Sequence, residues 1–156
     1  MLTLKELTSR FPQNGKLEWI GTRPGRRFAV ESHQQMAVLD RGLEADRSVR
    51  ANNRSVTLIQ AEHLPVIAAL CAKELVDPAE LRRNLVVSGI NLLALKGRQF
   101  SLGDVILEGM EICAPCSHME KILGTGGYNA MRGHGGITAK VIKTGIISIG
   151  DNITAL

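Results

Sequence analysis

Apolar and polar residues alternate along several short stretches of the sequence, which is the pattern of β-strands with one buried face. The clearest alternation covers residues 16–20 and ends at Gly21. Short apolar runs rich in Val, Ile and Leu, bounded by turn residues, cover 36–39, 56–59, 85–87, 105–107, 110–113, 137–142 and 146–149. The sequence therefore predicts a chain dominated by short strands, most of them in its second half.

A helical period interrupts the strands after the run at 56–59. Apolar residues spaced by three or four positions predict a helix over 61–73, whose buried stripe comprises Leu64, Ile67, Leu70, Cys71 and Leu75. The following segment, 77–80, offers an N-cap aspartate, a proline at the first helical position and a glutamate at the third. We expect a second, short helix from there to residue 83.

Residues 121–136 differ from the rest of the chain, because they include six glycines and few apolar side chains. We expect this segment to lie outside the core. Glycine lets backbone amides approach an anion closely, so a loop of this composition is either mobile or wrapped around a ligand.

Composition narrows the fold class. A chain of 156 residues with 44% hydrophobic content suits one core, so we expect a single domain over residues 1–156. Only 3% of the residues are aromatic whereas 16 are glycine, so Ile, Val and Leu must fill the interior between many tight turns. The chain therefore belongs to the mostly β (α+β) class, as a sheet or barrel with a few short helices.

Charge and the start of the chain bear on partners and compartment. The formal net charge of +4 favours anionic ligands in general. The basic residues are scattered and no aromatic platform accompanies them, which argues against nucleic-acid binding. The sequence has neither a signal peptide nor an apolar run of the ~18 residues that a membrane span requires. We expect a cytoplasmic protein with no membrane contact, whose three cysteines stay reduced.

The segment Cys113-Ala114-Pro115-Cys116 is the first candidate for chemistry, because Pro115 ends a strand and leaves the Cys116 thiol facing a cleft. Four interpretations remain open. The pair can join His118 and His134 in a zinc site. It can be a thioredoxin-like dithiol, although no amphipathic helix is predicted to follow it. It can be two incidental thiols, or Cys116 alone can be a thiolate that binds a soft metal or carries sulfur.

Basic residues occur at two further places of interest. Arg82, Arg83 and Asn84 lie between a predicted helix and a strand, where they either converge on a phosphate or merely end a solvated helix. Arg132 and His134 lie among glycines that expose backbone donors to the same kind of ligand; these glycines include Gly133 and Gly135. Cys71 fits packing in the core, and His33 and His63 fit solvated faces.

The ordered set of these residues resembles the MOSC family, named for the C-terminal domain of molybdenum cofactor sulfurase. The resemblance runs from Gly42 to the end of the sequence. It rests on 83–85, Gly89, Asn91, 100–105, 108–109, Pro115-Cys116, 132–137, 145–147 and 150–151. It implies a MOSC-type β-barrel with a few short helices, in a stand-alone member of bacterial type.

The resemblance also implies a cofactor and its ligands. The cofactor is the molybdenum cofactor, molybdopterin, and the metal-binding cysteine of the family maps to Cys116. Arg82 and Asn84, with Arg83 between them, map to positions near the pterin and its phosphate. The family often has Gly-Asp-Arg-His near the start of the domain, whereas this chain has Ala45-Asp46-Arg47-Ser48, so only Asp46 and Arg47 carry over.

Three functions follow from these observations. The first is a molybdenum enzyme that reduces N-hydroxylated compounds, with Cys116 as the protein's ligand to the metal and a separate protein as electron donor. The second is a sulfur carrier that receives a persulfide on Cys116 from a donor protein, for metal-sulfur cofactor assembly. The third is a module that binds a small anion through the basic glycine segment without chemistry. The sequence leaves open the substrate, the donor, the oligomeric state and any part played by Cys113.

Overall fold

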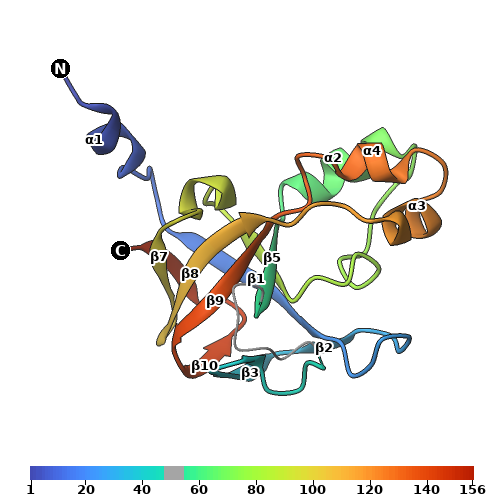
Figure 1. Ribbon diagram of the computed structural model, residues 1–156, viewed down its shortest axis with the longest axis horizontal. Helices are drawn as coiled ribbons and strands as arrows, with labels where there is room; N and C mark the ends of the chain where they lie inside the picture. The colour runs from blue at the N-terminus through green and yellow to red at the C-terminus, as the bar shows by residue number, and fades with distance from the viewer. Residues whose placement is uncertain (48–54) are drawn as a thin grey trace.

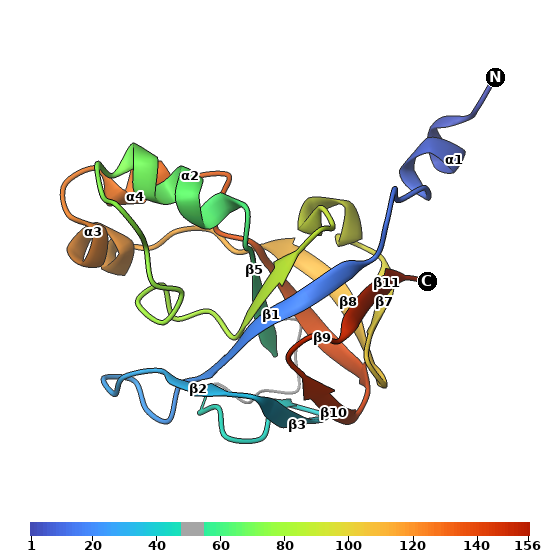
Figure 2. The same ribbon diagram turned by 180° about the vertical axis from the view of Figure 1, so that it is seen from behind.

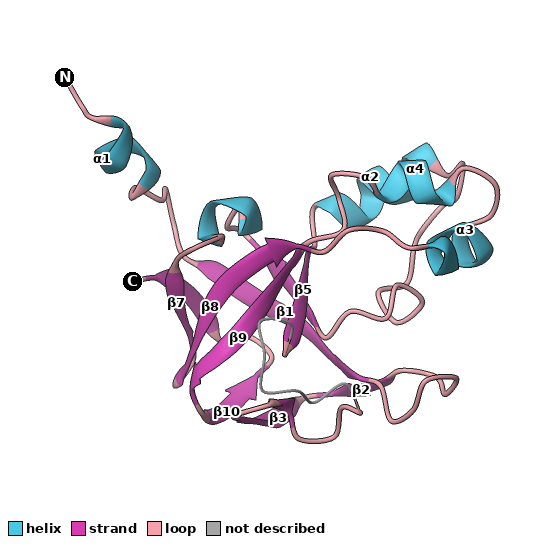
Figure 3. Ribbon diagram, in the orientation of Figure 1, coloured by secondary structure: helices cyan, strands magenta, loops and turns pink. Residues whose placement is uncertain are grey.

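The computed structural model describes residues 1–47 and 55–156. Its centre is a ring of strands, which are β1 (Gly15–Thr22), β5 (Val56–Gln60), β6 (Leu85–Ser88), β7 (Gln99–Leu102), β8 (Val105–Ile112), β9 (Ile137–Lys143) and β11 (Asn152–Ala155). They are ordered β11-β7-β8-β9-β5-β6-β1, and β1 pairs back to β11 at Gly15 and Ile153. β5 and β6 are parallel and the other neighbours are antiparallel. Within the described ranges these strands close a barrel (Figure 1; Figure 3), so the predicted mostly β fold with a few short helices is confirmed.

Shorter strands flank the barrel. β2 (Glu31–His33) pairs with the C-terminal part of β1, and β11 pairs with the N-terminal part of β1. A second sheet has the order β10-β3-β4, from Gly145–Ser148, Gln35–Leu39 and Gly42–Leu43. β3 and β10 confirm the strands predicted from the apolar runs at 36–39 and 146–149.

The barrel is filled by aliphatic side chains and one phenylalanine. Alternation along the strands places one side chain in two on the inside, so that Leu17, Phe100 and Leu102 are completely buried. The rest of this core comprises Ile20, Met36, Val38, Leu43, Val56, Leu58, Leu85, Val87, Ile90, Leu92, Leu95, Val105, Leu107, Ile137, Ala139, Ile147 and Ile153. The low aromatic content of the sequence is thus matched by a core of branched residues.

A second, smaller core lies under three helices at one end of the barrel (Figure 2). These helices are α2 (His63–Leu70), α3 (Ser117–Leu123) and α4 (Gly127–Met131). The core beneath them comprises Ile59, Ile67, Ala68, Val76, Leu81, Val86, Met119, Leu123 and Met131. We call this part the helical end. Two further helical segments lie elsewhere: α1 (Leu4–Thr8) and a single 3₁₀ turn, η1 (Leu92–Leu95).

Both helix predictions need correction. The helix expected over 61–73 is α2, which stops at Leu70, and its stripe is only partly right because Leu70 and Leu75 are exposed. Cys71 is partly buried against the second core. Residues 78–82 form turns instead of a helix; Asp77 does cap the Ala79 amide, with an Oδ1 to N distance of 2.9 Å. Arg82 then adopts a left-handed backbone with φ of +56°, which stops any helix there.

The glycine-rich segment 121–136 was expected to be a loop outside the core, and this expectation is wrong. It contains the end of α3 and the whole of α4, and it buries Leu123, Ala130 and Met131. The few apolar residues fall at positions where short helices turn them inward. The runs predicted at 105–107 and 110–113 also form the single strand β8, since Gly109 is not a turn but the point where the Leu95 carbonyl approaches the strand.

Candidate functional site

Cys116 is an exposed thiol between a barrel strand and a helix. β8 ends at Ile112, the Cys113 amide donates to the Gly136 carbonyl at 2.8 Å, and the chain then leaves the barrel. Cys116 is the N-cap residue of α3, whereas Cys113 is buried, and both thiols are free. The expectation that no helix follows this motif is therefore wrong. The exposure of Cys116 leaves its sulfur accessible to a ligand or a reactant.

The zinc interpretation finds no support in the described part of the chain, where no cluster of three or more His, Cys, Asp or Glu side chains is arranged to hold a metal. His134 is engaged elsewhere. Its Nδ1 lies 2.9 Å from the Ala130 carbonyl, which can only accept, so Nδ1 carries the proton. His118 is exposed on α3.

A cavity of about 390 Å³ lies next to α3. Its lining comprises Ala29, Val30, Ala79, Glu80, Arg82, His118 and Ile122. His118, which lines the cavity, follows Cys116 by two residues at the start of α3, and Cys116 itself does not line the cavity. The Arg82 guanidinium is held in place, since Nη1 donates to the Phe28 carbonyl at 2.8 Å and Nη2 to the Gly25 carbonyl at 3.0 Å.

Positive charge surrounds Arg82. Burial lowers the pKa of Arg82, the charges of Arg23 and Arg47 lower it further, and Asp46 acts in the opposite direction. Asp46 is buried and pairs with Arg23, with an Oδ2 to Nη2 distance of 2.9 Å and an Oδ1 to Nε distance of 3.1 Å. Asp46 therefore neutralises one arginine of the three, and Glu80 adds a second negative charge in the cavity lining, so these five groups together carry one net positive charge.

Asn84 is completely buried, and its side chain forms hydrogen bonds with other parts of the protein. Its Oδ1 accepts from the Thr57 amide at 3.0 Å and from Arg23 Nη2 at 3.3 Å, and its Nδ2 donates to the Gly21 carbonyl at 3.1 Å. These bonds tie β1, β5 and the start of β6 together. Asn84 thus holds Arg23 and the Arg82 backbone in position from behind the cavity, and its side chain does not line the cavity.

Arg83 is also buried, and it braces the backbone. Its Nε donates to the Gly135 carbonyl at 3.0 Å and its Nη1 to the Leu81 carbonyl at 2.8 Å. Gly135 in turn lies against the Cys113 carbonyl, where a side chain would collide. Arg83 therefore links the segment before β6 to the segment before β9, next to the strand that leads to Cys116.

The basic glycine segment has two exposed members and two that face inward. Arg132 and Gly133 are exposed, while Gly135 is buried. The His134 ring meets the His63 ring edge to face, with centroids 5.1 Å apart. Burial lowers the pKa of His63, the His134 charge lowers it further, and Glu62 opposes both. His63, expected on a solvated face, is thus partly buried against His134.

The predicted site residues therefore fall into four sets. Asp46, Arg82 and Asn84 are joined through Arg23, and Arg83 connects Gly135 to the strand before Cys116. Cys116, Arg132, Gly133 and Arg47 are exposed, and His134 turns toward α2. Sequence analysis missed Arg23, and single-sequence periodicity holds no signal for it. Ser48, which replaces the histidine frequent in related sequences, lies outside the described residues.

Residues 45–154 match the family model described as the MOSC domain. The chain belongs to the MOSC domain family. The match covers most of the chain and confirms the resemblance drawn from the motifs around Arg83 and Cys116. No curated protein matches the sequence significantly. Within the described residues, no helix of this MOSC protein combines the length and apolarity needed to cross a membrane.

Solved structures share the fold at low sequence identity. The YuaD protein from Bacillus subtilis has a TM-score of 0.81 at 19% identity, over 90% of this chain and 94% of its own. YiiM from Escherichia coli has a TM-score of 0.74 at 19% identity, over 93% and 70%. YiiM from Geobacillus stearothermophilus has a TM-score of 0.72 at 14% identity, over 91% and 75%. At these identities the likeness establishes the fold alone.

Proposed function

We propose that this MOSC protein binds the molybdenum cofactor at the helical end, with the Cys116 thiolate as the protein's ligand to the metal. The observation that carries the proposal is the exposed Cys116 sulfur, two residues before His118, which lines the cavity together with Arg82. Thiolate is a soft ligand of the kind that such metals take in proteins. Membership of the family supplies the general association with this cofactor.

The residues present fit an anionic pterin. A volume of about 390 Å³ lies within the range of small-molecule sites, and Arg82 presents a fixed guanidinium suited to a phosphate. Arg23 and Arg47 add positive potential there. Cys116 and Arg82, with the exposed Arg132 and Gly133 at the neighbouring segment, would hold the cofactor. When bound, the cofactor would supply two-electron redox chemistry, and the protein would fix its orientation.

Arg83, Asn84 and Asp46 take a different part in this proposal. Their side chains are buried and bonded to backbone atoms or to Arg23, so they position the groups that bind and do not themselves touch the cofactor. The finer activity that we propose is reduction of N-hydroxylated compounds, with a separate protein donating electrons.

The test is cofactor loading. The protein is expressed with molybdate in cells that make the cofactor, and bound molybdenum and pterin are measured on the purified protein. We expect Cys116→Ser to reduce the bound molybdenum by about tenfold or more, as for the loss of a metal ligand. Cys71→Ser is the matched control, because Cys71 does not line the cavity and packs against the second core. Equal loading of wild type and Cys116→Ser contradicts the proposed ligand.

A sulfur carrier is the second candidate, and the exposure of Cys116 beside a buried Cys113 favours it specifically. A persulfide must leave the donor and reach an acceptor, which requires an accessible sulfur. Incubation with a cysteine desulfurase and cysteine, followed by intact-mass spectrometry, should add one sulfur to wild type and none to Cys116→Ser. If this adduct does not form on a protein that does load molybdenum, the sulfur-carrier function is excluded and only the first function remains.

A further inference from the structure

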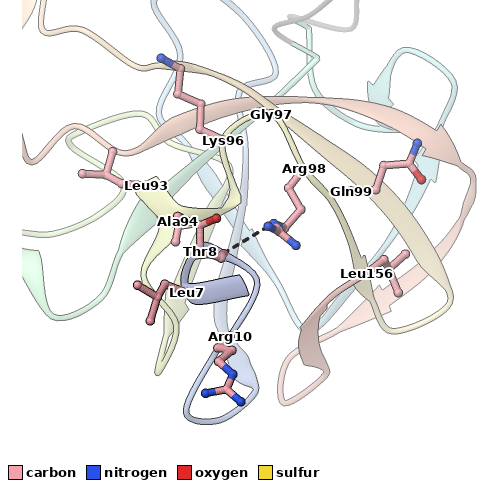
Figure 4. A pocket seen from close by; sticks show the side chains of 10 residues that line it. All are labelled: Leu7, Thr8, Arg10, Leu93, Ala94, Lys96, Gly97, Arg98, Gln99 and Leu156. Atoms are coloured by element: carbon pink, nitrogen blue, oxygen red, sulfur yellow. Dashed lines mark hydrogen bonds between the residues drawn. The ribbon is translucent and has the colours of Figure 1, made fainter. Parts of the chain in front are cut away.

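A hollow of about 770 Å³ lies between α1, η1 and the start of β7 (Figure 4). We call it the basic hollow. Arg10, Lys96 and Arg98 contribute positive charge to its lining, Leu7, Leu93 and Leu156 contribute apolar surface, and no acidic residue lines it. The proposed cofactor site does not use any of these residues.

α1 forms one wall of the basic hollow and stands away from the rest of the molecule (Figure 1). A capping box between Thr3 and Glu6 begins this helix, yet none of its five residues is buried. Arg98 holds it, since Nη2 donates to the Thr8 carbonyl at 3.2 Å and the guanidinium lies 5.7 Å from the centroid of the Phe11 ring. A helix this short is unstable alone in water, so a covering partner would stabilise it.

The charges are spread over the hollow and do not converge on one point. Figure 4 shows the Lys96 ammonium and the Arg10 guanidinium at opposite rims, with Arg98 between them bonded to Thr8. A small anion such as phosphate would meet only one of these groups at a time. An extended ligand with several negative charges can meet them together.

Exposed leucines complete the surface. Leu7, Leu93 and Leu156 are 53%, 46% and 59% exposed, and all three line the hollow. Apolar anchors with a charged rim are typical of protein interfaces. Single-stranded nucleic acid fits less well, because no aromatic side chain lines the hollow for base stacking. A second copy of the chain, with its net charge of +4, would bring like charges together.

We propose that the basic hollow docks an acidic segment of a partner protein, with leucine-type side chains of that segment packed against Leu7 and Leu93. In Figures 1 and 2 the hollow's elements, α1 and η1, lie away from α3, so the docked partner leaves Cys116 open. The proposal does not depend on the identity of the cofactor.

The probe is a fluorescein-labelled peptide of sequence Glu-Glu-Asp-Leu-Glu-Glu-Leu-Asp, titrated with the full-length protein by fluorescence anisotropy. We expect Arg10→Glu combined with Lys96→Glu to weaken binding by about tenfold or more, through loss of charge complementarity. Leu93→Ser should weaken it by about tenfold through loss of apolar contact. Cys116→Ser should bind as wild type does, which separates this proposal from the cofactor proposal.

The control carries the same charge change elsewhere. Lys73→Glu combined with Lys121→Glu alters two exposed residues at the helical end, and we expect less than a twofold change. Equal weakening by this control overturns the proposal, since binding would follow net charge alone. The proposal also fails if wild type does not bind the peptide, or if duplex DNA of equal charge binds more tightly. A wild-type dimer that Leu93→Ser dissociates would assign the hollow to a second copy instead.

Discussion

The barrel and the helical end are held together in different ways. Inside the barrel, completely buried side chains such as Leu17, Phe100 and Leu102 pack against one another around a closed ring. At the helical end the core is smaller, and individual polar side chains also hold buried or bent backbone. Arg83 binds the Gly135 and Leu81 carbonyls, and Glu120 binds the Gly126 and Tyr128 amides.

This difference indicates how each region tolerates change. Packing in the barrel is shared by many residues, so damage there lowers the stability of the whole chain. A side chain that binds backbone at the helical end supports one turn, so damage there alters the position of nearby groups first. The exposed thiol of Cys116 and the Arg82 cavity belong to the second region. Four substitutions test the comparison.

Phe100→Ala should have the largest effect. Phe100 is the largest completely buried side chain of the barrel, and its truncation should lower the free energy of unfolding by about 4 kcal/mol through lost burial and a residual cavity. Urea denaturation followed by circular dichroism measures this. Leu93→Ala, at a half-exposed position on η1, is the control and should change stability by less than about 0.5 kcal/mol. A small effect of Phe100→Ala would mean that the barrel core is not the main source of stability.

Gly136→Ala tests the junction of the two regions. Gly136 has φ of +84°, and an added Cβ would collide with the Leu58 carbonyl of β5. We expect a loss of about 3 kcal/mol in unfolding free energy from backbone strain and overpacking. Gly133→Ala is matched, since its φ is +81° but its Cβ meets nothing within 4 Å, and it should cost about 1 kcal/mol. Similar losses for both variants would show that strain alone, and not contact with β5, sets the cost.

Glu120→Gln should have a smaller, local effect. Glu120 Oε1 accepts from the Gly126 amide at 2.6 Å and Oε2 from the Tyr128 amide at 2.9 Å, so it supports the start of α4. These amide hydrogen bonds, from Tyr128 first and then Gly126, hold the pKa of Glu120 below its ordinary value. The substitution should raise amide exchange severalfold at Gly126 and Tyr128, as measured by NMR.

The lowered pKa of Glu120 also determines how the contribution of this residue to the fold changes with pH. A carboxyl whose pKa is lower in the folded state stabilises the fold above its unfolded pKa, and this contribution is lost as pH falls through the folded pKa. The amide exchange rate of Gly126 in wild type should therefore rise toward its rate in Glu120→Gln once the pH falls below about 4, which is close to the ordinary pKa of Glu. Glu111→Gln is the control, because Glu111 is exposed and its carboxylate caps no helix. Equal responses of the two variants would remove Glu120 from this role.

His63→Gln should have the smallest effect, and only in acid. Burial and His134 lower the pKa of His63, so the unfolded chain binds more protons at this position when the pH falls below the ordinary value of about 6.5. Wild-type stability should fall between pH 7.5 and 5.5 by on the order of a few tenths of a kcal/mol from this group, after solvent screening. The His63→Gln variant should lose this pH-dependent fall in stability, whereas the His118→Gln variant, changed at an exposed position on α3, should keep it. Urea denaturation at the two pH values decides between them.

The barrel was predictable from sequence because its signal is repeated. Each strand alternates or forms a short apolar run, so residues 16–20, 85–87 and 137–142 were recognisable without knowing their partners. The pairing order was not, since β1 closes on β11 across the length of the chain and β5 meets β6 in parallel. No local pattern records those contacts.

The helical end was predicted less well, for the opposite reason. α3 and α4 are short and carry glycines, and their inward residues, such as Leu123 and Met131, are too few to give a period. The exposure of Cys116 was identified correctly, whereas its place at the N-cap of α3, beyond the end of β8 at Ile112, was not. The buried placement of Arg83 and Asn84 was not foreseen, because it depends on the Gly135, Leu81 and Gly21 carbonyls, which sequence cannot place nearby.

The closure of the ring has a consequence for how the protein behaves at high concentration. Along β1, one side is occupied by β6 and the other is shared between β11 at Gly15 and β2 from Ile20 onward. The described ring thus leaves β1 with little unpaired backbone onto which a neighbouring molecule can add a strand, and β2 beside it is only three residues long and begins with a glutamate. Pairing of a neighbouring molecule with β1 should therefore require the barrel to open first.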